Sequence, residues 1–248
     1  MIEIQRVSKQ FSPSKKVLQA VSLTIETGEK CCIIGMSGMG KSVLMKLILG
    51  LETFQEGEII IDNQKIKHFS QREWRKLLHH FGVVFQGSAL FDSLNILENV
   101  GIKLYEEKQH KNEEIQAKVV AALQKVGLSE QILFQFPNEL SGGMQKRVAI
   151  ARAILHEPSY LIYDEPTTGL DPITSDLIDA LMLELAQEPK RTSIIVTHDL
   201  DTVQNIANKV VFLHQQKVYF AGSPQDFFRS QDAEVQRFLN RSRTKYSF

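Results

Sequence analysis

Residues 31–51 read "CCIIGMSGMGKSVLMKLILGL", and this stretch decides the fold. The short apolar run 31–34 predicts a buried β-strand, and the run after Lys41 has the apolar spacing of a helix. Between them, Gly35 to Ser42 fits the phosphate-binding pattern G-x-x-x-x-G-K-[ST], in the strand–loop–helix context that the pattern requires. The stretch therefore predicts an α/β fold built around a phosphate-binding loop.

The loop is expected to bind phosphate largely through its backbone. Its glycines let N–H groups curl around phosphate oxygens, and the helix that follows adds the partial positive charge of its N-terminus. Lys41 is expected to reach the β and γ phosphates, and the Ser42 hydroxyl to ligate Mg²⁺. At Met36 and Met39 only the backbone matters. The predicted nucleotide contacts of the loop are Gly35, Met36, Ser37, Gly38, Met39, Gly40, Lys41, Ser42 and Val43.

Two kinds of strand are expected from the apolar patterns. The segments "IEIQRV", "VSLTI" and "GEIIID" alternate apolar and polar residues, which is typical of antiparallel strands with one wet face. The continuous runs "CCIIG", "FGVVF", "YLIYD" and "SIIVTH" favour strands of a parallel sheet that helices cover on both sides. Each of these runs ends beside a polar residue or glycine, at the edge where ligands of open α/β sheets bind.

Helices are expected through the middle of the chain, from about 87 to 157. Asn112 is predicted to cap one helix and Gly127 to end it, with one apolar face formed by Ile115, Val119, Ala122, Leu123 and Val126. A second helix is predicted to open with Asp171 as cap and Pro172 in the first position. Its apolar stripe is predicted to comprise Ile173, Leu177, Ile178 and Leu181.

The composition bounds the possible partners. Among the 248 residues, 29 basic and 29 acidic side chains give a formal net charge of zero, which argues against a nucleic-acid-binding surface. The two cysteines, Cys31 and Cys32, are neighbours in an apolar run, so we expect buried, reduced thiols and no disulfide. No signal peptide or membrane span is predicted, so another chain would cross any membrane involved.

A second group of candidate residues follows the run "YLIYDEP". This strand would deliver Asp164 and Glu165 to the phosphate edge of the sheet. We expect Asp164 to hold Mg²⁺, through water, and Glu165 to act as the general base for the attacking water. An acidic turn without function is the alternative, which the phosphate-binding loop disfavours.

The segment "LSGGMQKR", residues 140–147, places Ser141, Gly142 and Gly143 at a helix start, which is a ready anion site. At this point the sequence resembles the ATP-binding cassette (ABC) family. The resemblance implies an ATPase that uses ATP and Mg²⁺, in which the signature helix of one copy closes on the γ-phosphate held by the other. It implies nucleotide contacts at Ser141, Gly142, Gly143 and Gln145.

The other marks of the family occur in order along nearly the whole chain. The resemblance implies that Phe11 stacks on adenine and that Gln86 contacts Mg²⁺ and the attacking water. It also implies that Asp171 belongs to the D-loop and that His198 senses the γ-phosphate. One departure is Val43, where most members carry Ser or Thr. One missing hydrogen bond is worth about 1 kcal/mol, so we expect slightly weaker nucleotide binding.

The resemblance also implies a domain layout. The fold class is a P-loop NTPase core with a mainly parallel sheet, an antiparallel β subdomain and an inserted α-helical subdomain. The core is expected at about 1–86 and 158–225, the helical subdomain at 87–157 and a helical tail at 226–248. We expect Val235, Phe238 and Leu239 of that tail to form an apolar face against a second copy.

The stretch "GSALFDSLNILENV", residues 87–100, carries the hypothesis about cargo. Its Leu90–Phe91 pair, rimmed by Asp92, predicts a docking surface for a membrane permease, although burial in the helical lobe is the alternative. Asp92 stands where cassette importers usually have Pro. The stretch resembles the ATPases of Mla-type phospholipid transporters and the related Mkl-type cassettes, as do "DPIT" at 171–174 and "EVQRFLN" at 234–240.

This subgroup implies a homodimer on the cytoplasmic face of a bacterial inner membrane. Its partners would be permease subunits and a lipid-binding MCE-domain protein, and its cargo phospholipid, in support of outer-membrane lipid asymmetry. The alternative within transporters is an importer of a small polar solute such as an amino acid or an ion. Outside transporters, the alternative is a cassette ATPase that acts on DNA or ribosomes, but the chain lacks the long insertion, second cassette or basic excess expected there.

Overall fold

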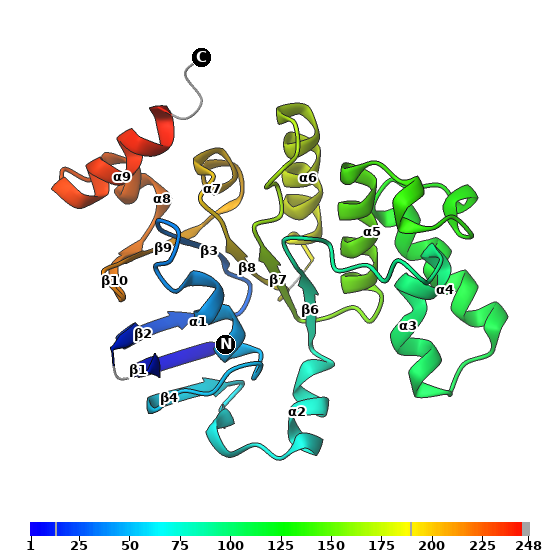
Figure 1. Cartoon of the computed structure of the whole chain (residues 1–248), viewed down its shortest axis with the longest axis horizontal. Helices are drawn as coiled ribbons and strands as arrows, with labels where there is room; N and C mark the ends of the chain where they lie inside the picture. The colour runs from blue at the N-terminus through cyan, green and yellow to red at the C-terminus, as the bar shows by residue number, and fades with distance from the viewer. Residues whose placement is uncertain (13, 189, 245–248) are drawn as a thin grey trace. The chain divides into compact units, whose positions relative to one another are not determined.

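The computed structural model describes residues 1–12, 14–188 and 190–244 (Figure 1), including the backbone but not the side chains of 242–244. The chain divides into two compact units, Met1–Leu78 with Ala186–Phe248, and His79–Leu185. Within the described residues, no helix combines the length and the apolar character needed to cross a bilayer. The first unit holds the phosphate-binding loop, and the second holds the signature segment.

An antiparallel sheet in the first unit confirms the expectation from the alternating segments. Its strand order is β2-β1-β4-β5, and Figure 1 labels the first three of these strands. The bounds are β1 Ile2–Ser12, β2 Lys15–Ile25, β4 Glu56–Ile61 and β5 Gln64–Lys65. One face of this sheet is buried. Alternate side chains of a strand point to the same face, so the apolar residues of the alternating segments gather there. The fully buried side chains of this face include Ile2, Val7, Ile25, Ile59 and Ile61.

A second sheet of the first unit has the order β10-β9-β3-β8 and supports the phosphate-binding loop. β3 runs parallel to both β8 and β9, while β10 pairs antiparallel with β9. The bounds are β3 Lys30–Ile34, β8 Thr192–Val196, β9 Lys209–His214 and β10 Lys217–Gly222. Every residue of β8 is buried, which confirms that the continuous apolar run has no wet face.

Short helices complete this unit. They are α1 at Lys41–Ile48, the 3₁₀ turn η1 at Ile66–His68, α2 at Gln71–Leu78, α7 at Leu200–Ile206, α8 at Pro224–Arg229 and α9 at Ala233–Thr244. α1 begins directly at the end of the phosphate-binding loop, as the sequence predicts.

The second unit combines one parallel strand pair with a helical bundle. Helices α3, α4 and α5 pack on one another, and α5 also packs on β6 and α6 (Figure 1). The strands are β6 Phe81–Val84 and β7 Tyr160–Asp164. The helices are α3 Ile96–Glu107, α4 Asn112–Lys125, η2 Glu130–Ile132, η3 Pro137–Glu139, α5 Gly142–Ile154 and α6 Pro172–Leu185. The α/β fold class is confirmed.

Two details of the helix predictions are wrong. Asn112 is the first residue of α4 rather than its cap, because the chain turns helical one residue earlier, after Lys111. In α6, Ile173 and Leu177 are 75% and 59% exposed, so the buried stripe runs instead through Ile178, Leu181, Met182 and Leu185. The predicted apolar face of α4 is confirmed, and Gly127 ends that segment at φ +68°.

The C-terminal helix α9 packs on its own chain, which contradicts the expectation of an apolar face for a second copy. Val235, Phe238 and Leu239 are at most 5% exposed. The Phe238 ring lies 4.9 Å from that of Phe212 on β9. Residues 245–248 of the predicted tail lie outside the described residues.

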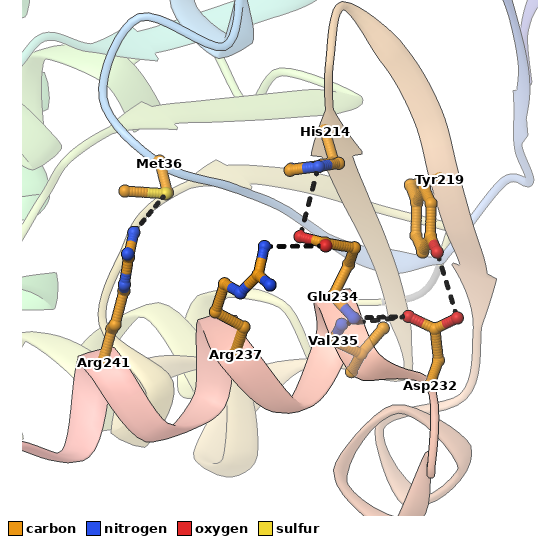
Figure 2. A network of polar contacts seen from close by, with 8 residues as sticks. All are labelled: Met36, His214, Tyr219, Asp232, Glu234, Val235, Arg237 and Arg241. Atoms are coloured by element: carbon orange, nitrogen blue, oxygen red, sulfur yellow. Dashed lines mark hydrogen bonds and ion pairs between the residues drawn. The ribbon is translucent and has the colours of Figure 1, made fainter.

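Polar contacts hold α9 on the same surface, and Figure 2 shows them. The Tyr219 hydroxyl donates to Asp232 at 3.0 Å, just before the helix begins. Near the other end of α9, the Arg241 guanidinium lies 3.7 Å from the sulfur of Met36 in the phosphate-binding loop.

Burial predicts that both thiols are inert in the folded chain. Cys31 and Cys32 are fully buried, and burial, helped by Glu29, raises the pKa of the Cys31 thiol to about 12. Because the thiolate is the reactive form, we expect no reaction with a disulfide reagent at pH 8 in native protein. In denaturant, both thiols should react within minutes. Rapid native labelling of either cysteine, measured by mass spectrometry, would contradict the buried strand.

Candidate functional site

The phosphate-binding loop leaves β3 through a position that accepts only glycine. Gly35 has φ +151°, and a Cβ placed there would lie 2.5 Å from the carbonyl oxygen of Leu213 on β9. Gly40, at the far end of the loop, has φ +94°, and its Cβ would lie 2.9 Å from the Val17 carbonyl oxygen. Both ends of the loop are therefore fixed by close backbone approach, which explains the spacing of the motif.

Lys41 is enclosed by the loop. It is 8% exposed, and its Nζ donates to the carbonyl oxygens of Gly35 at 2.9 Å and Met36 at 3.3 Å. Ser42 and Val43 follow in the first turn of α1 and are half-buried. The loop thus gathers an ammonium group, a hydroxyl and the N-terminus of α1, a combination that suits a phosphate chain.

Two further predicted residues belong to the same unit. His198 follows β8 by two residues, and β8 is the parallel neighbour of β3, with Val196 opposite Ile33. The carboxyl ends of these strands share one edge, so His198 and the phosphate-binding loop both follow that edge. Phe11 lies on β1, its ring is 51% exposed, and the Lys9 Nζ lies 4.7 Å from its centroid.

The acidic pair and Gln86 belong to the second unit. β7 ends at Asp164, which is 9% exposed, and Glu165 follows with φ +49°, where the Thr168 hydroxyl donates to its carboxylate at 3.1 Å. β6 and β7 are parallel, with Val84 opposite Tyr163, and Gln86 follows β6 as an exposed residue. Asp164, Glu165 and Gln86 therefore meet at one edge of this pair.

The signature segment forms the start of α5, as predicted. Ser141 is the cap, and its hydroxyl accepts the Met144 N–H at 3.3 Å. A Cβ on Gly143 would lie 2.5 Å from the Thr174 methyl group of α6, so glycine lets the two helices approach. Ser141 and Gly142 are exposed, whereas the Gln145 amide donates to the carbonyls of Pro137 and Leu140. A nucleotide contact by Gln145 stays a prediction.

Asp171 caps α6, as predicted. Its carboxylate accepts the Thr174 N–H at 3.0 Å and the Thr174 hydroxyl at 2.5 Å. These hydrogen bonds, the hydroxyl first, lower the pKa of Asp171 below its ordinary value. The residue is exposed and stays ionised well below neutral pH.

The segment after Gln86 has one exposed ring. Phe91 is 51% exposed, Leu90 is half-buried and Asp92 is exposed. Asn99, a fully buried residue of α3, accepts the Phe91 N–H at 2.7 Å and donates to the Phe91 carbonyl at 3.0 Å. The sequence left open whether Leu90 and Phe91 belong to the core or to the surface. The structure places Phe91 on the surface of this chain, whereas Leu90 is half-buried.

The comparison with known proteins decides the family. The sequence profile of the ABC transporter family matches residues 18–168, which span the phosphate-binding loop, the signature segment and the acidic pair. The chain belongs to the ABC transporter family. It is an ATP-binding subunit and an ATPase, as the resemblance implies.

Relatives named after different molecules are similar to this ABC ATPase along almost its whole length. The methionine import protein MetN of Clostridium tetani is 39% identical and covers 96% of the chain and 74% of the relative. The protein TRIGALACTOSYLDIACYLGLYCEROL 3 of Arabidopsis thaliana is 37% identical, and the match covers 98% of this chain and 74% of the relative. The probable ribonucleotide transport protein mkl of Mycobacterium tuberculosis is 35% identical, with 96% and 66% covered.

Solved cassettes share the fold of this ABC ATPase. The dimeric bacterial ABC transporter cassette MJ0796 is 33% identical, with a TM-score of 0.83 over 90% of this chain and 99% of that one. The same cassette bound to ADP and phosphate in a post-hydrolysis state gives a TM-score of 0.82. At this identity the likeness extends from the fold to the nucleotide-binding family.

Sequence reasoning missed three residues that support the segment after β6. Asn99, Lys146 and Arg152 each bond to its backbone. Lys146 and Arg152 share α5 with a third cation, Arg147, and no local pattern marks which of these side chains supports the segment.

The close approach at Gly35 predicts a large loss of stability on substitution. In Gly35→Ala, the new Cβ meets a backbone oxygen in addition to the conformational strain, so the free energy of unfolding should fall by about 2–4 kcal/mol. Gly38→Ala is the matched control, because Gly38 has φ +79° and nothing within 4 Å of its Cβ. It should lose only about 1–2 kcal/mol in urea unfolding. Equal losses would contradict the role given to the Leu213 carbonyl.

Proposed function

We propose that this ABC ATPase energises a membrane permease that transports phospholipid. The observation that carries the proposal is the segment after Gln86, where an exposed Phe91 stands beside Asp92 instead of the usual proline. The likeness of this segment to the ATPases of Mla-type phospholipid transporters supports the lipid assignment. The similarity to TRIGALACTOSYLDIACYLGLYCEROL 3 of Arabidopsis thaliana, a protein named after a galactolipid, agrees with it.

In this proposal the first unit binds the nucleotide. Phe11 stacks on adenine through its exposed ring. The backbone N–H groups of 35–42 cradle the phosphates, Lys41 pairs with their charge and the N-terminus of α1 adds its dipole. His198 contacts the γ-phosphate from the neighbouring strand end. Val43 offers no hydroxyl, so affinity for ATP is set by the remaining contacts.

The proposed metal is Mg²⁺, held by Ser42, Gln86 and Asp164. A hydroxyl, an amide oxygen and one carboxylate are oxygen donors, and Mg²⁺ in such sites binds through one or two carboxylates together with substrate phosphates. The residues therefore fit the ion. When bound, Mg²⁺ would neutralise charge on the β and γ phosphates.

Glu165 is proposed as the general base. Its carboxylate follows the strand that ends at Asp164, and the Thr168 hydroxyl fixes one of its oxygens at 3.1 Å. Gln86, at the end of the parallel neighbour β6, would orient the water from which Glu165 accepts a proton.

Two copies of the chain are proposed to enclose two ATP molecules. Ser141, Gly142 and Gly143 lie at the exposed start of α5, where N–H groups and the helix dipole favour an anion. The similar cassette MJ0796 is dimeric. ATP would favour the closed dimer, because both copies contact its phosphates.

The membrane partners proposed are permease subunits and an MCE-domain lipid-binding protein, with the ATPase at the cytoplasmic face of a bacterial inner membrane. The cargo would be phospholipid, and transport would maintain lipid asymmetry of the outer membrane. The second candidate is a small-solute importer, which the 39% identity to the methionine import protein of Clostridium tetani favours.

The cargo can be tested by purifying the ATPase with its membrane partner. Mass spectrometry of the complex should find co-purifying phospholipid and an MCE-domain chain. A solute-binding protein in the complex, with ATPase activity stimulated by methionine, would replace the lipid proposal with the importer.

Glu165→Gln should abolish hydrolysis, with a loss of at least about hundredfold in phosphate release. ATP binding, measured by equilibrium dialysis, should remain, because the phosphate contacts are unchanged. Glu157→Gln is the control, since Glu157 is a surface carboxylate whose side chain is 78% exposed, and it should hydrolyse ATP at the native rate. Undiminished phosphate release by Glu165→Gln would disprove the role of Glu165.

Phe91→Glu should uncouple the ATPase from its permease. A charge at the centre of an apolar contact is expected to weaken docking by at least about tenfold, while basal ATPase activity of the isolated chain persists. Phe134→Glu is the control, because Phe134 is 67% exposed in another segment of the same unit. The measurement is ATPase stimulation by the permease in proteoliposomes. Full stimulation of Phe91→Glu, or its failure to fold, would overturn the docking assignment.

A further inference from the structure

The backbone after β6 adopts a strained conformation that needs outside support. Ser88 and Ala89 are consecutive non-glycine residues with φ +61° and φ +50°. Left-handed backbone is unfavourable for residues that carry a side chain, and such strain persists only where surrounding groups determine the conformation. Turn hydrogen bonds from the Ser88 N–H to the Phe85 carbonyl and from the Ala89 N–H to the Gly87 carbonyl are short-range and cannot orient the segment against the helices.

Lys146 supplies one anchor for this segment from the signature helix. It is 4% exposed, and its Nζ donates to the carbonyl oxygens of Gln86 and, at 3.4 Å, Phe85. Burial lowers the pKa of Lys146, whereas the carboxylates of Asp164 and Glu165 favour its charged form. The buried ammonium group thus joins the backbone of Gln86 to the helix that begins at Ser141.

Arg152 supplies a second anchor six residues further along the same helix. Its Nη1 donates to the Ala89 carbonyl at 2.7 Å, and its Nη2 donates to the Ser88 carbonyl at 2.8 Å. The planar fork therefore binds the two strained residues together. Hydrogen bonds from a charged donor are worth more than neutral ones, so this contact can offset the strain.

Asn99 supplies the third anchor, from α3. Its side-chain amide donates to the carbonyls of Phe91 and Leu94, and its oxygen accepts the Phe91 N–H. Each end of segment 85–94 is thereby tied to a helix, while the Phe91 ring remains half exposed. The segment is built as a rigid piece of the second unit and presents one apolar side chain.

We propose that Lys146 and Arg152 are positioning residues of this ATPase. They fix segment 85–89 to the signature helix α5, so that Gln86, Phe91 and Ser141 move as one body. A permease that displaces Phe91 would then displace the metal-binding amide and the phosphate-binding helix start together. This inference rests on the proposed roles of Gln86 and Phe91, but the anchoring itself is testable in the chain alone.

The test is hydrogen exchange in the full-length chain without nucleotide. Lys146→Met and Arg152→Met keep similar length and remove the donors, so amides of residues 86–91 should exchange at least about tenfold faster. Arg147→Met is the matched control, because Arg147 lies on the same helix and donates to Gly127 instead. It should leave exchange of this segment unchanged. Native exchange rates in both folded test variants would overturn the proposal.

A second readout separates positioning from mere stability. Lys146→Met should raise the Mg²⁺ concentration for half-maximal ATPase activity about fivefold or more, since Gln86 loses its backbone anchor. Arg147→Met should leave that concentration unchanged even if it lowers the melting temperature equally. The proposal would be contradicted if the Mg²⁺ concentration for half-maximal activity changed equally in Lys146→Met and Arg147→Met. Such a result would mean that it depends on stability alone.

Conservative variants keep the test decisive if a methionine variant does not fold. Arg152→Lys keeps the charge but offers a single nitrogen in place of the planar fork, and Lys146→Gln retains a neutral donor on a shorter side chain. Each should show faster exchange of residues 86–91 than the native chain, while Arg147→Met keeps the native rate. Native exchange in both would overturn the anchoring. By contrast, permease stimulation that survives Phe91→Glu would remove the docking role while leaving the anchoring intact.

Discussion

The close approach of the Gly35 backbone to the Leu213 carbonyl is the constraint on which the site depends. It allows β3 to leave the sheet sharply, so that residues 36–40 can curl and return into α1. A side chain at position 35 would push the loop away from β9 and disturb the two carbonyls, of Gly35 and Met36, that accept hydrogen bonds from Lys41. The conformation of the loop therefore requires glycine, which has no Cβ, at position 35.

Parallel pairing then decides which polar residues meet. Strand ends on one edge bring Gly35 near His198 in the first unit and Asp164 near Gln86 in the second. Different contacts position these groups. Close glycine contacts shape the loop, the Thr168 hydroxyl binds the Glu165 carboxylate, and cations bind the backbone of the segment after β6. Rigid elements thus carry the candidate residues, and short connections orient them.

Much of the fold and most of the candidate site could be predicted from sequence, because strand–loop–helix chemistry is local. The glycine pattern, the strand periods and the caps at Ser141 and Asp171 all depend on neighbours within a few residues. The cap predicted at Asn112 is wrong by a single residue, which is a local error. The other failures depend on distant partners. The exposure of Ile173 and Leu177 and the cover over Phe238 are set by tertiary packing, and the contacts of Lys146 join residues 60 positions apart. No local pattern encodes those distances.

Helix α9 packs on β9, the strand that also contacts the start of the phosphate-binding loop. Phe212, which contacts Phe238, immediately precedes Leu213, whose carbonyl abuts Gly35. Cleavage by a protease before residue 233 would strip the cover from Phe212 and Phe227 and leave an apolar surface beside the loop.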